Sequence, residues 1–270
     1  PETNAVIIDE AHNLPKAAYH QLTATFDNRS INYVLDRIDP QHGHSVRWNS
    51  SLRSIASIHP KFEINRSILQ DLVENTRLKL KIFFENMTSS SLHRFDEKSK
   101  YSTKLIIDNL VEHFAPLEFE ISDFKHSLNN LRNHIRKLRE LLLDIDETKE
   151  DFLELHQIFD RGEGALSDIF VLTEKITSKQ NPDNVYWYEG TFKNISGKAQ
   201  LLLTVNMAPI EPGHDIANTI FHNLDHCVLT SATLRTKMSF DYFLNRVGLN
   251  EMDFDGLTTS VFESPFSYND

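Results

Sequence analysis

Cysteine, long apolar runs and a phosphate-binding glycine loop are scarce or missing in this sequence of 270 residues. The one cysteine, Cys227, excludes a disulfide within the chain and indicates a reducing, cytoplasmic environment. A membrane-spanning helix needs about 20 apolar residues in a row, and no stretch of the sequence approaches that length. The first residues also lack the basic and then apolar pattern of a signal peptide. We therefore expect no association with a membrane.

The shortage of cysteines and the lack of a phosphate-binding glycine loop exclude two kinds of cofactor site within this chain. An iron-sulfur cluster needs four thiolates, so none is built within this chain, and Cys227 is expected to pack as a small apolar residue. A loop that cradles ATP phosphates has the pattern G-x-x-x-x-G-K-[ST]. Neither "RGEGA" at 161–165 nor the pair Gly197-Lys198 satisfies that pattern. We therefore expect that the isolated chain neither binds ATP tightly nor hydrolyses it.

The net charge is −11, whereas proteins that handle DNA usually present a basic face. The charges nonetheless occur in blocks, because residues 125–139 are basic and residues 144–154 are acidic. One interpretation is that the blocks belong to a solvated face or to two antiparallel helices that pair these charges. The other is that the basic stretch follows the phosphates of single-stranded DNA, although it has no aromatic stacking residue after Phe124. The candidate DNA-binding residues are Arg132, Arg136, Lys137 and Arg139.

A short buried strand is predicted near the start of the chain, in "VIIDEAHNLP" at 6–15. Asp9 and Glu10 follow it directly, at the carboxyl end of the strand, where open α/β sheets bind ligands. A carboxylate pair at that place suits nucleotide hydrolysis, in which Asp9 orders the waters around Mg²⁺ and Glu10 polarises the attacking water. The alternative is a solvated loop before a helix capped by Asn13.

A second apolar run, "CVLTSATL" at 227–234, predicts another strand. It ends in small hydroxyl residues, Thr230 and Ser231, followed by Ala232 and Thr233. If the two strands are neighbours, these hydroxyl groups lie beside the acidic pair.

The two motifs resemble motifs II and III of superfamily 2 helicases, with "DEAH" after one strand and "LTSATL" far downstream. The longer stretches "VIIDEAHNLP", "APIEPGHDIANTIFHNLDHCVLTSATL" and "FESPFSY" are similar to the DinG branch, which is related to XPD. The resemblance covers roughly residues 4–20 and 200–268. Between them, the chain matches only as a helical insertion of suitable length.

The resemblance implies specific roles for these residues. Asp9 would coordinate Mg²⁺ through water, Glu10 would be the catalytic base, and His12 would couple the ATP site to Ser231, Ala232 and Thr233. The residues alone support the first two roles, whereas a single histidine beside a strand end is more typical of a structural hydrogen bond. The implied ligands and partner are ATP, Mg²⁺ and single-stranded DNA.

The middle of the chain predicts long helices. Apolar residues from Ile121 to Ile145 alternate spacings of three and four, which indicates a helix from near Glu118 to Asp146. A second helical segment continues from Phe152 to Leu172, where Gly162 and Gly164 mark a break or a close approach. We expect these two helices to pack antiparallel.

Shorter elements surround this pair. We expect a helix over 69–87, a polar loop over 88–100 and a short helix over 105–114. After the turn at 181–183, "VYWYEG" and "AQLLLTVNMAP" predict a hairpin that returns the chain to the sheet of the first strand. A helix is expected over 215–223.

The predicted fold is α/β, an incomplete RecA-like motor domain into which a large helical domain is inserted. The insertion looks like the arch of XPD-like helicases. Motor-domain residues are expected in the first part and again after the insertion, with a short link to a second motor domain at the end. The ranges are 1–25 (motor domain), 26–61 (connection), 62–180 (arch-like insertion), 181–262 (motor domain) and 263–270 (link).

Functions of different classes stay open. In the first, the chain is a fragment of a DinG-like 5′-to-3′ DNA helicase that acts in DNA repair or replication. In the second, it is a helical protein-interaction module without enzymatic activity, and "DEAH" is only a strand end. A further alternative is a helicase fused to a 3′-to-5′ exonuclease. Both motifs together, with "SPFSY" near the end, favour the first, whereas the oligomeric state cannot be inferred.

Overall fold

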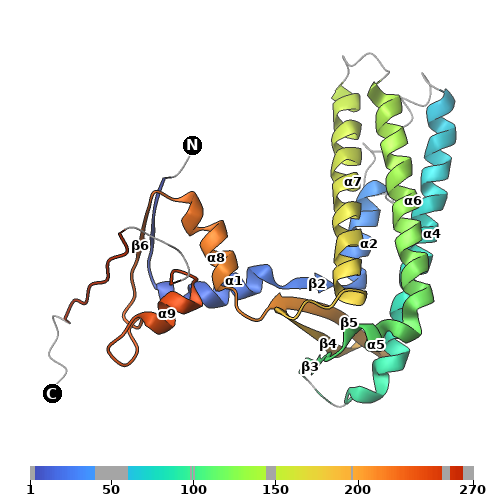
Figure 1. Cartoon of the computed structure of the whole chain (residues 1–270). Coiled ribbons are helices and arrows are strands. Elements are labelled where there is room, and N and C mark those ends of the chain that lie inside the picture. Colours follow the sequence, from blue (N-terminus) through green and yellow to red (C-terminus); the bar gives the residue numbers. More distant parts are fainter. Residues whose placement is uncertain are drawn as a thin grey trace. The chain divides into compact units, whose positions relative to one another are not determined.

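The computed structural model describes residues 4–39, 60–97, 99, 101–143, 150–195, 197–250 and 256–263 (Figure 1). The chain divides into two compact units. The small unit joins Pro1–Thr23 to Ala208–Asp270, and the large unit is Ala24–Met207. In the described part of the chain, no helix has both the length and the apolar character needed to cross a bilayer.

The small unit is built on two parallel strands. Strand β1 (Ala5–Ile8) pairs with β6 (His226–Leu229), and Ile8 lies opposite Leu229 at the carboxyl ends. The helices of this unit are α1 (Leu14–Leu22), α8 (Gly213–Thr219) and α9 (Asp241–Arg246). Pro15 stands in the first turn of α1, where a missing N–H costs nothing. The predicted strands at both motifs are therefore confirmed as neighbours in one sheet.

The core of the small unit forms around α8 and α9, with Phe221, Phe243 and Val247 buried. The backbone at Gly248 closely approaches the backbone at Gly213, at the start of α8. Gly248 has a φ of +76°, and a Cβ there would come within 2.1 Å of the Gly213 oxygen. Only glycine fits at position 248, since both the left-handed conformation and the contact exclude a side chain.

Among its described residues, the large unit combines a bundle of long helices with an antiparallel sheet. The bundle helices are α2 (Asn28–Ile38), α4 (Pro60–Ser91), α6 (Glu118–Leu143) and α7 (Glu150–Thr177). Helix α6 contacts both α4 and α7, while α2 packs on α4 and α7 (Figure 1). The sheet has the order β2-β5-β4-β3.

The three-and-four spacing of apolar residues in α6 is the reason that it occupies the middle of the bundle. A helix that is contacted on two sides needs a wide apolar stripe, and six members of the predicted seam are buried to 3% exposure or less. They are Phe124, Leu128, Leu131, Ile135, Leu138 and Leu142. The predicted antiparallel pairing with α7 is confirmed by three ion pairs, in which residue numbers rise along α6 and fall along α7. These pairs are Lys125–Glu174, Arg136–Glu163 and Arg139–Asp160. Ile145 lies outside the described residues.

The predicted hairpin is confirmed as β4 (Asn184–Ile195) and β5 (Lys198–Pro209), which are joined at Gly197 with a φ of +80°. The edge strands are β2 (Ala24–Phe26) and β3 (Thr103–Ile106). From the sheet, the side chains of Phe26, Tyr186 and Tyr188 pack in the same hydrophobic core as those of the helices. The expectation that the hairpin returns to the sheet of the first strand differs from the structure, because β4 and β5 pair with β2 and β3 instead.

Two local predictions were wrong, and one of the two alternatives for a glycine pair is excluded. Residues 105–106 belong to strand β3 rather than to a helix, and α5 (Leu110–Phe114) begins after them, because Leu105 pairs with Tyr188. The predicted loop over 88–100 is helical to Ser91 and has a 3-10 turn over Leu92–Arg94. The glycines at 162 and 164 do not break α7.

The two units also differ from the predicted ranges. Residues 24–39 and 181–207 belong to the large unit with the helical bundle, whereas the sequence assigns them to a connection and to the motor domain. The predicted link at 263–270 lies outside the described residues after Glu263, and so does most of "FESPFSY".

Candidate functional site

The carboxyl ends of β1 and β6 are joined by backbone hydrogen bonds beyond the strands themselves. The Thr230 N–H donates to the Ile8 oxygen at 2.9 Å, and the Ala11 N–H donates to the Thr230 oxygen at 2.9 Å. These two bonds carry the pairing past the last strand residues. As a result, the acidic pair after β1 and the hydroxyl residues after β6 lie at one edge of the small-unit sheet, as the sequence predicted.

Asp9 accepts two hydrogen bonds on Oδ1. The Thr230 hydroxyl donates at 2.5 Å and the Glu10 backbone N–H donates at 2.9 Å. These donors hold the pKa of the Asp9 carboxyl below its usual value, the Thr230 bond contributing most. The residue is solvent-exposed, so it presents an ionised carboxylate to water at neutral pH.

Glu10 turns the chain out of the strand in a left-handed conformation, with φ 49° and ψ 40°. Such a conformation is uncommon for a residue with a side chain and tends to occur where the surrounding structure requires a particular orientation. The Glu10 side chain is 61% exposed. The sharp turn therefore places a second carboxylate beside the first without burying either.

His12, Ser231 and Glu10 form a closed set of polar contacts. His12 Nδ1 lies 2.8 Å from Ser231 Oγ and 3.1 Å from Glu10 Oε2, and the Ser231 hydroxyl donates to the same Oε2 at 3.2 Å. Because that hydroxyl has one proton, its remaining role toward Nδ1 is to accept. The structure thus brings together three of the residues that the sequence singled out, from two motifs 219 positions apart.

Thr233 and Ala232, the other two candidate residues of the second motif, make no side-chain hydrogen bond to the acidic pair among the described residues. The Thr233 N–H donates to Ser231 Oγ at 3.4 Å, which supports the turn after β6. Ala232 is exposed between them. The sequence places the Thr230 hydroxyl beside the acidic pair without giving it a role, and the structure shows that it donates to Asp9.

The donor set at Asp9 fits a magnesium ion that is held indirectly. No group of three or more His, Cys, Asp or Glu side chains that could hold a metal ion occurs among the described residues. Mg²⁺ commonly keeps several waters and uses one or two carboxylates together with substrate phosphates. An exposed, ionised Asp9 meets that requirement, with Glu10 adjacent for a water molecule.

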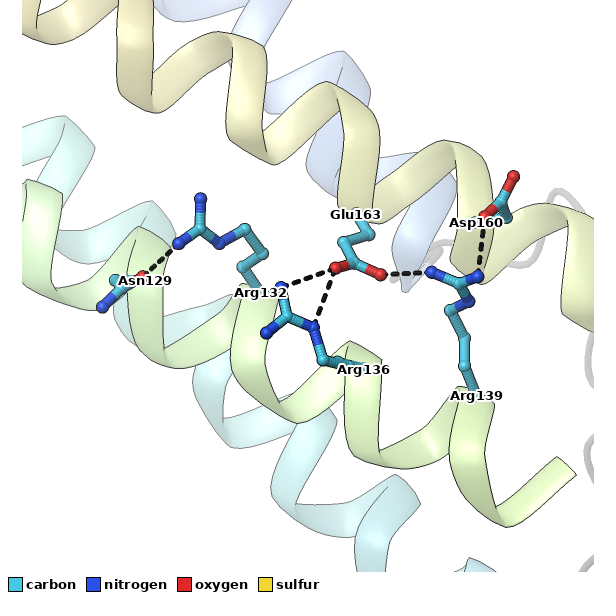
Figure 2. A network of polar contacts seen from close by, with 6 residues as sticks. All are labelled: Asn129, Arg132, Arg136, Arg139, Asp160 and Glu163. Atoms are coloured by element: carbon cyan, nitrogen blue, oxygen red, sulfur yellow. Dashed lines mark hydrogen bonds and ion pairs between the residues drawn. The ribbon is translucent and has the colours of Figure 1, made fainter. Parts of the chain in front are cut away.

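Two of the candidate DNA-binding residues of α6, Arg136 and Arg139, are engaged by α7 (Figure 2). Arg136 contacts Glu163 through two nitrogens at 2.9 and 3.0 Å. Arg139 pairs with Glu163 and, at 2.9 Å, with Asp160. Burial acts to raise the pKa of Glu163, but its hydrogen bonds with Arg136 and Arg139 outweigh burial, and the pKa is lowered.

The remaining two candidates differ from these. Arg132 donates to Asn129 at 2.7 Å and its guanidinium lies 5.7 Å from the centre of the Phe170 ring (Figure 2). Lys137 is exposed and makes no polar contact within the described part of the chain. The geometry favours the charge-pairing interpretation for Arg136 and Arg139.

Among the described residues, the acidic partners of Arg136 and Arg139 are Glu163 and Asp160, which lie after the acidic block at 144–154. The two ion pairs share one antiparallel register, since the α6 position advances by three from Arg136 to Arg139 while the α7 position recedes by three from Glu163 to Asp160. Residues 144–149 lie outside the described residues.

No protein-family model matches the chain. Over its whole length the chain is similar to two bacterial proteins. It is 25% identical to the 3′-5′ exonuclease DinG of Bacillus subtilis, of which it covers 28%. It is 24% identical to the ATP-dependent DNA helicase DinG of Photobacterium profundum, of which it covers 36%. These matches support a DinG-like helicase relationship. The chain thus spans about a third of the length of these DinG relatives.

Proposed function

We propose that this chain is part of an ATP-dependent DNA helicase of the DinG type, which moves 5′ to 3′ along a single strand in DNA repair or replication. The observation that carries the proposal is the joined set of Asp9, Glu10, His12, Thr230 and Ser231 at the carboxyl ends of β1 and β6. It occurs in a chain that resembles two DinG proteins from end to end. We assign these residues to the hydrolysis side of an ATP site.

In this proposal Asp9 holds a hydrated Mg²⁺. The Thr230 hydroxyl and the Glu10 N–H both donate to Oδ1, so the carboxylate is fixed in orientation and stays ionised. When bound, the ion would neutralise charge that develops on the nucleotide phosphates. The part of Asp9 is to orient water ligands rather than to bind the ion directly.

Glu10 is proposed to position the attacking water and to accept its proton at Oε1 or Oε2. Its side chain is exposed, and Oε2 is held by Ser231 and His12. Two neighbours on one oxygen limit rotation of the carboxylate, which favours a fixed direction for proton acceptance.

His12 and Ser231 are proposed to couple hydrolysis to movement on DNA, together with Ala232 and Thr233. The direct contact between His12 and Ser231 links the two motifs across the sheet, while both touch Glu10. A change at the Glu10 carboxylate during hydrolysis therefore reaches the segment after β6 through a single hydrogen bond.

ATP binding itself is assigned to residues of the longer protein, because these 270 residues contain no G-x-x-x-x-G-K-[ST] loop. The isolated chain is accordingly expected to be inactive. The name of the Bacillus subtilis relative, 3′-5′ exonuclease DinG, raises the alternative of a helicase combined with a 3′-to-5′ exonuclease.

The proposal is tested by Glu10→Gln in the longer protein. A neutral amide keeps the size of the side chain but cannot accept the proton, so ATP hydrolysis should fall by about 10²- to 10⁴-fold while ATP affinity stays unchanged. Nucleotide binding by calorimetry and phosphate release by a coupled assay measure the two quantities. Loss of nucleotide binding, with hydrolysis per bound ATP unaffected, would instead make Glu10 structural.

His12→Ala in the same protein is the companion variant. It removes the contact with Ser231 and leaves the carboxylates in place, so strand separation should fall more than DNA-stimulated ATP hydrolysis. If both activities fall by the same factor, the coupling role of His12 is contradicted while the role of Glu10 stands.

A further inference from the structure

Helix α4 is apolar on two sides. One side packs into the bundle, where Leu69, Val73, Leu80 and Phe83 are buried. On the opposite side, four large aliphatic side chains are between 37% and 64% exposed. These are Ile64, Ile68, Leu78 and Ile82. An exposed apolar stripe along a helix is unusual on a monomer and often marks an interaction surface.

The exposed stripe has the spacing of a coiled-coil seam. With Asp71 and Asn75 included, its members follow one another at intervals of four, three, four, three and four residues. This is the heptad pattern, and the residues at its two seam positions are Ile64, Asp71 and Leu78 at d, and Ile68, Asn75 and Ile82 at a. At about 1.5 Å per residue the seam is about 27 Å long.

The seam is symmetric about its centre, which allows it to pair with itself. In an antiparallel pair of α4 helices, Ile64 of one copy meets Ile82 of the other, and Ile68 meets Leu78. At the centre Asp71 meets Asn75 of the second copy, and this pair forms twice by symmetry. The Asn75 amide can donate to the Asp71 carboxylate, so both polar residues of the seam gain a partner.

A parallel pair is disfavoured by the same residues. It would place Asp71 against Asp71 of the second copy, and two carboxylates at the centre of an apolar seam repel each other. The Asp71 carboxylate therefore favours the antiparallel direction. We propose that the exposed α4 face is a dimerisation surface on which a second copy of this chain docks antiparallel.

Site-specific disulfide formation tests the proposal, in a Cys227→Ser background that removes the native thiol. Asp71→Cys and Asn75→Cys chains are purified separately and then mixed under mild oxidation. We expect cross-linked dimers to form faster in the mixture than in either sample alone, since position 71 faces position 75 of the second copy. Faster linking in the Asp71→Cys sample alone would mean a parallel pair and would overturn the proposal.

Sedimentation equilibrium of the 270-residue chain provides the second measurement. A seam of this length makes a weak dimer, so association should depend on chain concentration. Leu78→Glu should weaken association roughly tenfold or more, because it places a charge in the seam. The matched control is Val171→Glu, which changes a residue of α7 that is 44% exposed, and it should have no effect.

Circular dichroism of each variant checks that the helices still form. A chain that stays monomeric at every concentration, or a control that weakens association as much as Leu78→Glu, would exclude the α4 face as a self-docking surface.

Discussion

At the scale of single residues, two glycines in one helix differ in whether neighbouring atoms leave room for a side chain. A Cβ at Gly162 would lie 3.1 Å from Cγ1 of Ile38, which is buried on α2. At Gly164 no atom lies within 4 Å of that position. The sequence offered a break or a close approach for this pair, and the structure shows a close approach at Gly162 alone.

The difference leads to a matched prediction. Gly164→Ala should raise the free energy of unfolding by about 0.5–1 kcal/mol, because alanine loses less conformational freedom in a helix and meets nothing. Gly162→Ala should gain less, since Ile38 must move, and Gly162→Val should destabilise by about 1–3 kcal/mol. Urea unfolding followed by circular dichroism measures all three. Equal gains for the two alanine variants would contradict the packing seen at Ile38.

At the scale of elements, the α6 and α7 helices are held by apolar packing inside and by ion pairs along one side. Glu163 is the centre of the ion pairs, since it is 16% exposed and accepts from two arginines. Arg136 is 54% exposed, so its guanidinium is largely hydrated in the folded chain. Replacing Glu163 should therefore lower the free energy of unfolding more than replacing its partner Arg136.

Glu163→Gln should destabilise the chain by about 1–3 kcal/mol at pH 7, because the half-buried Arg139 loses a charged acceptor. Arg136→Gln, the control, should cost less than about 1 kcal/mol. The folded pKa of Glu163 is lowered from its ordinary value of 4.5. Its stabilising contribution is therefore complete above pH 4.5 and is lost as the pH falls through the lower folded value.

Urea unfolding at several pH values checks this sign. The stability difference between the native chain and Glu163→Gln should shrink below pH 4.5. A difference that grows on acidification would mean that the carboxylate is not stabilised by its arginines.

At the scale of the whole molecule, a net charge of −11 and the engaged arginines of α6 bear on DNA binding. Replacing Arg132, Arg136 and Arg139 together would disturb the contact with α7 as well as any contact with phosphates. Lys137 is the better probe, because it is exposed and leaves the ion pairs of Figure 2 intact.

We expect the isolated chain to bind single-stranded DNA weakly, and Lys137→Ala to change that affinity by less than about twofold. Fluorescence anisotropy of a labelled oligonucleotide at two salt concentrations measures this. Strong binding that falls steeply with salt and is weakened by Lys137→Ala would instead make α6 a DNA guide, as the alternative interpretation of the basic block holds.

The sequence by itself determined the elements whose signal repeats along the chain. The seam of α6, the hairpin around Gly197 and the strands at 6–8 and 227–229 are all found where they were predicted. Each rests on periodicity or on a turn residue, and both are local properties. The neighbourhood of Asp9 and Ser231 was also foreseeable, because both follow apolar strands.

Tertiary structure decided the features that depend on contacts between distant parts of the chain. Leu105 was assigned to a helix because a short apolar run fits either element, and its pairing with Tyr188 made it a strand. The hairpin joined the sheet of the large unit, since strand pattern does not specify which strands pair. Likewise, the arginines of α6 met Glu163 and Asp160 because antiparallel packing brought them together, a contact that charge counts along the chain cannot reveal.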